Sequence, residues 1–240
     1  MSAAWESPDV RTAGLDGVAS WSWRSLYNDR YPSLHNDRYL VKSEITIVMK
    51  KEMAMGKPKG GGGDARQKLI DAAGRGFRVG GYGGIGVDGL AKEAGLTSGA
   101  FYAHFGSKAD AFTVAVSEGM ECLYRGVQSF QESHGEDWIG PFVEFYLGPR
   151  MDVALSDACA LPTFTSDVSR SSGPTRTAYS EALKRIVELV AKGLRGRNRE
   201  ARAWQILSLL SGAAGMARAV ADPAMRAAII EAAKTAASAV

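Results

Sequence analysis

Residues 86–108 read GVDGLAKEAGLTSGAFYAHFGSK, and the spacing of apolar residues in this stretch predicts two short helices around a tight turn. The apolar face of the first helix would consist of Val87, Leu90, Ala91 and Ala94. Gly95 follows where a glycine with positive φ commonly ends a helix, and Leu96 can fill the corner. The stretch therefore predicts a helix that stops abruptly at residue 95.

The second helix begins at Thr97 or Ser98, because either side chain can accept a hydrogen bond from the free N–H groups of a helix start. Phe101 and Phe105 are four residues apart and would both face inward. The outward face carries small or hydrogen-bonding residues and no acid, namely Ser98, Gly99, Ala100, Tyr102, Ala103 and His104. This combination is typical of a helix-turn-helix, whose second helix enters the major groove of DNA.

Composition is that of an ordinary globular protein, with 45% hydrophobic and 23% charged residues. No apolar run approaches the roughly 18 residues of a membrane span, and the N-terminus lacks a signal-peptide pattern. Cys122 and Cys159 do not suggest a disulfide framework, so we expect a cytoplasmic protein without a membrane partner. The net charge is only +3, but basic residues outnumber acidic ones between 50 and 108, where contacts with phosphate would be needed.

Residues 1–63 differ from the rest of the chain. They hold three of the five tryptophans without a sustained helical period, and they end in the basic, glycine-rich linker KPKGGGG. We expect a disordered extension. The alternative is a translated leader, with the native start at Met49, Met53 or Met55.

Residues 64–108 are predicted to form the DNA-binding domain and residues 109–240 a larger helical domain. A helix from Asp64 to Val79, capped by Asp64, would precede the helix-turn-helix, and a glycine-rich loop would connect the two. Ser107 would cap a long helix. The buried stripe of that helix would be Phe112, Val116, Met120, Leu123, Val127 and Phe130.

The remainder also reads as helical, and no convincing strand follows residue 50. Shorter helices broken at Pro141, Pro149 and Pro162 are expected first. Two long helices would follow, the second at about 199–221 and apolar around nearly its whole circumference. Asp222 and Pro223 would open a last, alanine-rich helix. The predicted fold class is therefore all-α.

The order of these elements resembles the TetR/AcrR family of bacterial transcriptional regulators. The likeness is carried by residues 80–112, GGYGGIGVDGLAKEAGLTSGAFYAHFGSKADAF. It implies an N-terminal three-helix DNA-binding domain with the helix-turn-helix, followed by a larger helical domain for ligand binding and dimerisation. The chain departs from the family at Ile85-Gly86, where Thr or Ser is usual, and at Ser98 and Ala103, where many members carry a basic residue.

The resemblance also implies which residues would contact DNA. Base edges would be approached by Thr97, Ser98, Gly99 and Ala100; phosphates or bases by Tyr102 and His104; and phosphate alone by Lys108. Lys57, Lys59 and Arg66 could contact the backbone or the minor groove, or could be solvated charges. The alternatives for Tyr102 and His104 are a half-buried packing aromatic and a surface residue without a role in DNA binding.

A ligand cavity in the larger domain is likewise implied by the resemblance. Its candidate lining is Met120, Tyr124, Trp138, Phe142, Phe145, Tyr146, Met151, Cys159 and Phe164, although any of these could simply pack. Cys159 could be a reactive sensor thiol or a small buried hydrophobe. The candidate dimer interface is Leu183, Ile186, Val187, Val190, Leu207, Leu210 and Ala214.

Enzymatic chemistry has no support in the sequence. Gly81, Gly83 and Gly86 form GxGxxG, but a nucleotide site would need a preceding strand, so a connecting loop is expected. Motifs for metal binding or hydrolysis are missing, so we expect neither cofactor nor catalysis. The predicted function is a homodimeric repressor released from a palindromic operator by a small molecule. The alternatives are an activator of the same family and a helical small-molecule binding protein without DNA function.

Overall fold

A computed structural model describes residues 61–240 of the chain. The expected extension up to residue 60, with Lys57, Lys59 and the three candidate start methionines, lies outside the described residues. The helices are α3 (Gly61–Gly84), α4 (Val87–Glu93), α5 (Ser98–His104), α6 (Lys108–His134), α7 (Ile139–Tyr146), α8 (Ala160–Ser169), α9 (Gly173–Gly193), α10 (Arg199–Ala219) and α11 (Pro223–Ala239). Short 3₁₀ turns are η2 (Gly135–Asp137), η3 (Pro149–Met151) and η4 (Leu155–Asp157). The all-α prediction is confirmed.

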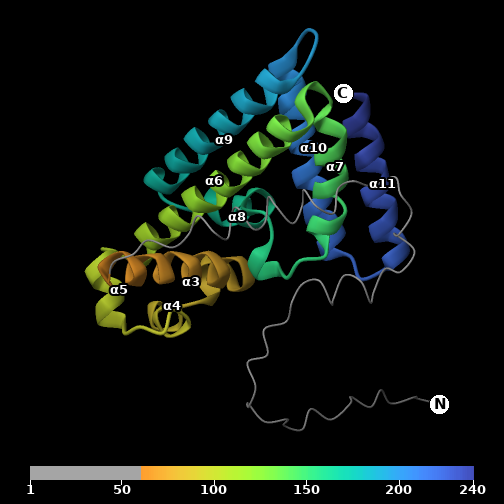
Figure 1. Cartoon of the computed structure of the whole chain (residues 1–240). Helices are drawn as coiled ribbons and strands as arrows, with labels where there is room; N and C mark the ends of the chain where they lie inside the picture. The colour runs from red at the N-terminus through yellow and green to blue at the C-terminus, as the bar shows by residue number, and fades with distance from the viewer. Residues whose placement is uncertain (1–60) are drawn as a thin grey trace, which may run out of the picture. The chain divides into compact units, whose positions relative to one another are not determined.

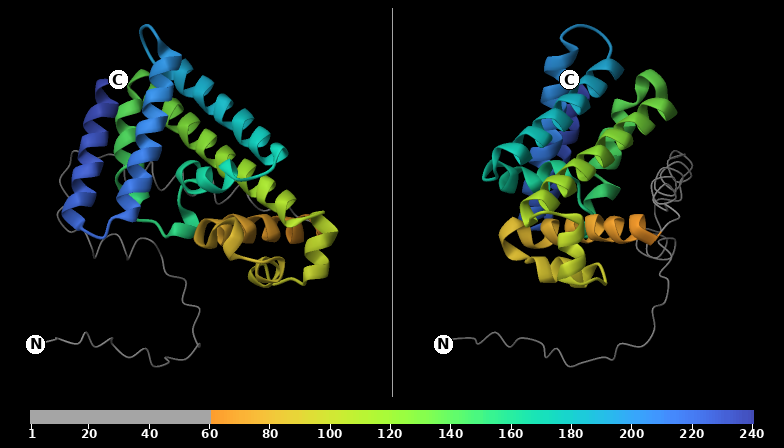
Figure 2. Two further views of the ribbon diagram at one scale, coloured as in Figure 1. Left: turned by 180° about the vertical axis from the view of Figure 1, so that it is seen from behind. Right: turned by 90° about the vertical axis from the view of Figure 1, so that its left-hand side faces the viewer.

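Helices α3, α4 and α5 gather at one end of residues 61–240, and the long helix α6 leads away from them (Figure 1). Helix α9 packs along α6, α10 packs against α9 and α11, and α7 contacts both α6 and α11. The two views in Figure 2 also show α3, α4 and α5 at one end, apart from the bundle formed by the later helices. None of the helices in this part of the chain is long and apolar enough to cross a membrane.

The turn chemistry of the helix-turn-helix agrees with the sequence prediction. Gly95 has φ 69°, which ends α4. Thr97 is the N-cap of α5, and its hydroxyl accepts the Ala100 N–H at 3.2 Å. Ser107 caps α6 in the same way, accepting the Asp110 N–H at 3.1 Å. Each cap satisfies an N–H group that the helix itself leaves unpaired.

The start and end of α3 differ from the prediction. The helix begins at Gly61, so Asp64 lies within its first turn and pairs with Lys68 instead of capping the helix. At the other end the expected glycine-rich loop is helical up to Gly84, interrupted by a kink at Gly81 with φ 68° and ψ 174°. The Tyr82 ring packs 5.1 Å from that of Phe112, and this contact holds the segment after the kink against α6.

Two of the three prolines expected to break helices do not break them. Pro141 and Pro162 are each the third residue of their helices, α7 and α8. An N–H group in the first turn has no partner within the helix, so proline loses no hydrogen bond there. Only Pro149 lies between helices, at the start of η3.

The predicted stripe of α6 is buried along its whole length, and one glycine sets how closely α8 approaches it. A Cβ on Gly119 would lie 2.5 Å from the Cβ of Ala160 and 2.9 Å from the guanidinium of Arg78. Real Cβ atoms do not come so close, so only glycine permits this packing. Gly126, two turns further along the helix, has open space around it.

We therefore expect Gly119→Ala and Gly126→Ala to change stability in opposite directions. Both gain about 1 kcal/mol of helix propensity. Gly119→Ala in addition overpacks the α6–α8 contact, at about 1–3 kcal/mol. Thermal unfolding followed by circular dichroism should show a raised midpoint for Gly126→Ala and a lowered one for Gly119→Ala. Equal shifts in the two variants would contradict the close approach.

Candidate nucleic-acid interface

The recognition helix α5 is held by aromatic side chains beneath it. Phe101 and Phe105 are 0% and 4% exposed, and their ring centroids are 5.3 Å apart. They join a core with Leu90 of α4, which is also fully buried. On the surface, Arg75 Nε of α3 donates to Glu93 Oε1 of α4 at 2.9 Å. The three helices therefore form one packed unit that presents the opposite face of α5 to solvent.

That outer face carries most of the residues predicted to contact DNA. Tyr102 is 58% exposed, and its ring makes an edge contact with that of Phe101, with the centroids 5.5 Å apart. Thr97, Gly99 and Ala103 are also exposed, whereas Ala100 and His104 are half-buried. Small residues beside an exposed tyrosine allow the helix to approach base edges closely.

Three of the residues predicted to contact DNA already interact with other residues of the protein. The Ser98 hydroxyl donates to the carboxylate of Asp88, which ties α5 to α4. Lys108 Nζ lies 4.7 Å from the centre of the Tyr82 ring. Arg66 is exposed, with its guanidinium 5.7 Å from the centre of the Phe105 ring. Ser98 therefore contributes to the geometry of the turn, beyond any role in reading bases.

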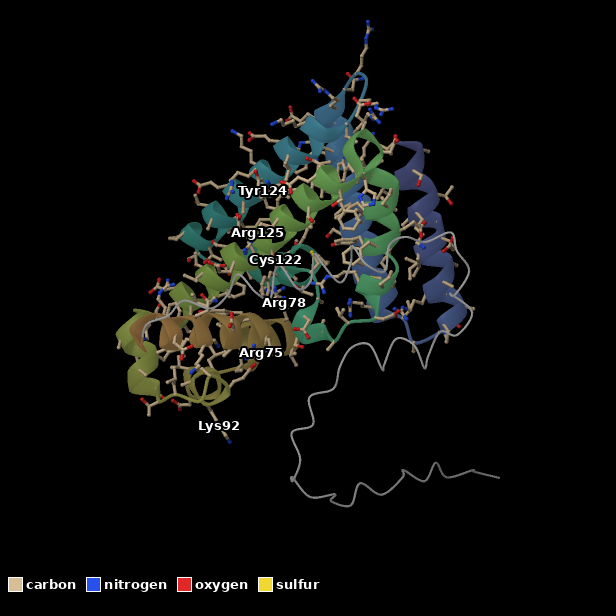
Figure 3. All side chains as sticks on the ribbon, in the orientation of Figure 1. Arg75, Arg78, Lys92, Cys122, Tyr124 and Arg125 are labelled. Atoms are coloured by element: carbon tan, nitrogen blue, oxygen red, sulfur yellow. The ribbon has the colours of Figure 1, made fainter. Side chains whose placement is uncertain are left out.

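Lys92 is a candidate that the sequence analysis did not single out. It is exposed in the last turn of α4, and Figure 3 shows its side chain extending away from the ribbon at the end of the molecule where α4 and α5 lie. It forms no ion pair with any residue between 61 and 240. Only the fold shows that this lysine lies on the same side as the recognition helix.

A second feature joins this domain to the larger one through Arg78 of α3 (Figure 3). Its Nε donates to the carbonyl of Ala158 at 2.8 Å, its Nη1 donates to the carbonyl of Gly74 at 2.8 Å, and its guanidinium lies 4.9 Å from the centre of the Phe164 ring. Burial lowers the pKa of Arg78 from its usual value, but arginine remains a cation at neutral pH.

The kink of α3 makes a further contact with α8. The N–H of Tyr82 donates to Asp167 Oδ2 at 2.9 Å, and Arg170 pairs with Oδ1 of the same carboxylate at 2.8 Å. Gly81 adopts the positive φ that turns this N–H toward α8. We call the two hydrogen bonds, Arg78 to Ala158 and Tyr82 to Asp167, the α3–α8 clasp.

Most of the residues predicted to line a ligand pocket are buried in the larger domain. Six of the nine are buried in the core: Met120, Trp138, Phe142, Tyr146, Met151 and Phe164. Tyr124, Phe145 and Cys159 are half-buried. Trp138 has a structural role, since its Nε1 donates to the carbonyl of Gly193 at 2.9 Å.

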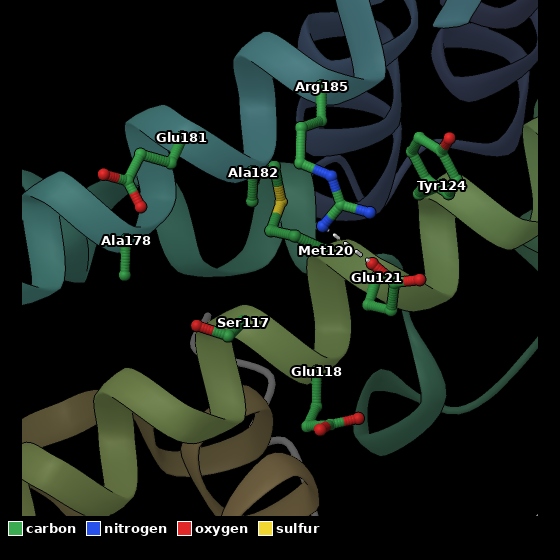
Figure 4. A pocket seen from close by; sticks show the side chains of 9 residues that line it. All are labelled: Ser117, Glu118, Met120, Glu121, Tyr124, Ala178, Glu181, Ala182 and Arg185. Atoms are coloured by element: carbon green, nitrogen blue, oxygen red, sulfur yellow. Dashed lines mark ion pairs between the residues drawn. The ribbon is translucent and has the colours of Figure 1, made fainter.

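A cavity of about 330 Å³ lies between α6 and α9 (Figure 4). Its lining is Ser117, Glu118, Met120, Glu121, Tyr124, Ala178, Glu181, Ala182 and Arg185. Only Met120 and Tyr124 were predicted. Arg185 pairs with Glu121 at 3.2 Å and lies 4.7 Å from the centre of the Tyr124 ring, so Glu118 and Glu181 leave the groove acidic.

The residues predicted to form the dimer interface are mostly buried within the single chain. Ile186, Val187, Val190, Leu207, Leu210 and Ala214 are at most 3% exposed within a single chain, and Leu183 is half-buried. Their apolar side chains pack α9 and α10 against the rest of their own subunit, so they offer little surface to a second copy. The exposed apolar residues of α10 are Trp204 and Met216, at 43% and 56%.

The clasp predicts how the Tyr82 amide exchanges with solvent. Asp167→Ala removes the acceptor of this N–H, and a hydrogen bond to a charged group is worth enough to speed local opening at least about tenfold. Asp167→Asn keeps an acceptor oxygen and should change exchange less. Hydrogen–deuterium exchange on a peptide containing Tyr82 measures both, with exposed Ser180→Ala of α9 as control. Unchanged protection in Asp167→Ala would rule out the contact.

Comparison with known proteins supports the interpretation of this interface. The family described as "Bacterial regulatory proteins, tetR family" matches residues 69–113. The HTH-type transcriptional regulator LmrA of Bacillus subtilis (strain 168) is 29% identical over 141 residues, which is 55% of this chain and 72% of LmrA.

Crystal structures of similar fold extend the likeness to the larger domain. Reduced NemR of E. coli superposes with a TM-score of 0.65 at 17% identity, covering 74% of this chain and 96% of NemR. A TetR-family regulator from Cytophaga hutchinsonii gives a TM-score of 0.62 at 19% identity, covering 77% and 98%. At these identities the structures support the fold alone. The helix-turn-helix and the two sequence matches support a transcriptional regulator of the TetR/AcrR family, and the solved structures show that the larger domain shares the fold.

Proposed function

We propose that the protein is a homodimeric repressor that leaves a palindromic operator when a small molecule binds its larger domain. The observation that carries this proposal is the α3–α8 clasp, because it makes the first helix of the DNA-binding domain part of the packing of the larger domain. Regulators of this family bind DNA and act as dimers with small-molecule effectors. Residues 64–108 would be the reading domain and residues 109–240 the controlling domain.

DNA would be contacted through the outer face of α5 and its flanks. Thr97, Gly99, Ala100 and Tyr102 would approach bases. Phosphates would be contacted by His104, Lys108, Arg66 and, as an addition, Lys92. Two copies would place their recognition helices about one helical turn of DNA, ~34 Å, apart. The two-fold symmetry of the dimer would make the operator roughly palindromic, and this distance would set the separation of its half-sites.

The dimer would form through the exposed faces of α10 and α11, which replace the buried residues predicted from sequence. A Cβ added to Gly212 or Gly215 of α10 meets nothing within 4 Å in the single chain. Glycine in a helix costs about 1 kcal/mol relative to alanine, and nothing within the subunit requires it here. Close approach of a second copy at these glycines, beside Trp204 and Met216, would explain why α10 has glycine there.

Release would follow from a change in the clasp. A ligand can shift the two states of a regulator only by its difference in affinity for them. Ligand contacts that move η4 or α8 would loosen the hydrogen bonds of Arg78 and Tyr82 and so re-orient α3. The two recognition helices would then no longer match the spacing of the operator.

We expect Tyr102→Ala to weaken binding to an inverted repeat beside the protein's own gene by about 1–3 kcal/mol. Lys92→Ala should weaken binding uniformly across sequences and lower the slope of log affinity against log salt by about 1. Fluorescence anisotropy at several salt concentrations measures both, with exposed Lys184→Ala of α9 as control. The interface is wrongly assigned if Tyr102→Ala binds as well as wild type while remaining dimeric.

The dimer surface predicts the effect of Gly212→Arg. The side chain has room in the single chain but would bury an unpaired charge between two copies, which raises the dimer dissociation constant at least about 100-fold. Light scattering coupled to gel filtration should show monomers of normal helicity, and operator affinity should fall. Gln128→Arg, on the exposed face of α6, is the control. A Gly212→Arg protein that stays dimeric would place the interface elsewhere.

A further inference from the structure

We propose that Asp88 of α4 determines base specificity by holding the proton of the Ser98 hydroxyl, so that Ser98 accepts hydrogen bonds from DNA but does not donate them. The bases selected by such an acceptor are the two with an exocyclic amino group in the major groove, adenine and cytosine, which we call the amino bases. The inference rests on the proposed function, because it names the class of base that one position of the operator must carry.

The hydrogen bond between Ser98 and Asp88 has only one possible direction. Asp88 lies in the first turn of α4, where the positive end of the helix dipole favours the charged carboxylate. An ionised carboxylate has no proton to give, so the Ser98 hydroxyl is the donor. A hydroxyl has one proton and two lone pairs, and this contact engages the proton. Only the lone pairs of Ser98 remain for a partner outside the protein.

The preceding residue, Thr97, has the opposite arrangement. Its hydroxyl oxygen accepts the N–H of Ala100 at 3.2 Å, so its proton remains free. Thr97 can therefore donate to a phosphate or to a base oxygen, whereas Ser98 cannot. The partners of these two neighbouring hydroxyls within the protein thus assign them different contacts with DNA.

The position of Ser98 suits a contact with a base edge. It is the first residue of α5, and the N-terminal residues of a recognition helix are those that contact bases in the major groove. The next residue, Gly99, is exposed, and a Cβ there would meet only Thr97 Oγ1, at an ordinary 3.7 Å. Packing within the subunit therefore does not require this glycine. A close approach to DNA explains it, and the short side chain of Ser98 needs such an approach.

The major groove then decides which bases an acceptor can recognise. Adenine presents the donor N6 and cytosine the donor N4. Guanine presents O6 and N7 and thymine presents O4, and all three are acceptors. Ser98 would therefore bond an amino base on the nearer strand, whereas at guanine or thymine two acceptors would face each other. The negative charge of Asp88 would add to this discrimination, because it also repels the base oxygens.

The charge of Asp88 is otherwise unfavourable on this surface. The side chain is exposed, and no basic residue between 61 and 240 forms an ion pair with it. Phosphates attract basic side chains and repel acidic ones, so an acid beside the recognition helix lowers the affinity for every DNA sequence. Control of the Ser98 hydroxyl would offset this loss, because it raises discrimination at one base pair.

The test uses the full chain and a random library of double-stranded DNA, from which bound sequences are selected and read. We expect wild type to enrich sequences with an amino base at one position of each half-site, on the same strand relative to the site. Ser98→Ala should lose the preference at this position and keep it elsewhere. Ser98→Thr, which keeps a hydroxyl, should retain the preference.

Asp88→Asn tests the role of the carboxylate. An amide carries both a donor and an acceptor, so it no longer fixes the proton of Ser98. By fluorescence anisotropy, wild type should bind the site with an amino base at least about fivefold more tightly than the same site with guanine or thymine. In Asp88→Asn this ratio should approach one, and loss of the charge should raise the affinity for unrelated DNA about twofold.

Asp110→Asn is the matched control. It also removes an acid from the first turn of a helix, α6, but Asp110 has no hydrogen bond to Ser98 in the described part of the chain. The ratio between amino bases and the other two should stay at its wild-type value. A merely structural role of Asp88 would weaken binding to all four bases alike and would leave the ratio unchanged.

Base analogues test the contact at a single atom. Purine and 2-pyrimidinone lack only the amino group of adenine and of cytosine. Such an analogue at the selected position should weaken binding by wild type at least about fivefold and should leave binding by Ser98→Ala unchanged.

The proposal is overturned if wild type selects guanine or thymine at this position, if Ser98→Ala keeps the wild-type preference everywhere, or if Asp88→Asn discriminates as strongly as wild type. Failure of wild type to enrich any sequence would refute the proposed function itself. Enrichment without a contribution from Ser98 would refute only the class of base.

Discussion

The placement of Arg78 is the constraint on which the two-domain arrangement depends. A guanidinium that leaves water must find acceptors, and those of Arg78 lie on two sides, Gly74 in its own helix and Ala158 beside α8. This requirement fixes the end of α3 against the larger domain. Gly119 leaves the space that this placement of Arg78 needs, since a side chain there would collide with Arg78 and Ala160.

Under the proposed function, this arrangement would couple the DNA-binding domain to the larger domain. The recognition helix rests on Phe101 and Phe105, which join the common core, and the guanidinium of Arg66 of α3 lies 5.7 Å from the centre of the Phe105 ring. Because α3 is one packed element up to its kink at Gly81, a change at its C-terminal end would be transmitted to the proposed DNA-binding surface. A switch between two states requires a small domain that is rigidly packed. It also requires contacts at the border of that domain, such as the two hydrogen bonds of the clasp.

The sequence predicted the parts of the fold that local chemistry decides. The helix-turn-helix, the stop at Gly95, the caps at Thr97 and Ser107 and the buried stripe of α6 all follow from residues close together in the chain. Where longer contacts decide, the prediction was wrong. The glycine-rich segment after Val79 reads as a loop by composition, but packing of Tyr82 against Phe112 and its hydrogen bond to Asp167 keep it ordered and largely helical.

The family resemblance and the local geometry of the helix-turn-helix were thus predicted from the sequence alone, because motif spacing and capping are local. Only the tertiary structure shows what the apolar residues of the larger domain pack against. Periodicity predicts that Leu207 and Trp138 are buried, but not whether a ligand, a second subunit or the residue's own core covers them. In the structure both are buried within their own subunit. Likewise, no spacing in the sequence could show that Arg78 reaches the carbonyl of Ala158 or that the Tyr82 N–H meets Asp167, because such contacts depend on what surrounds each group in space.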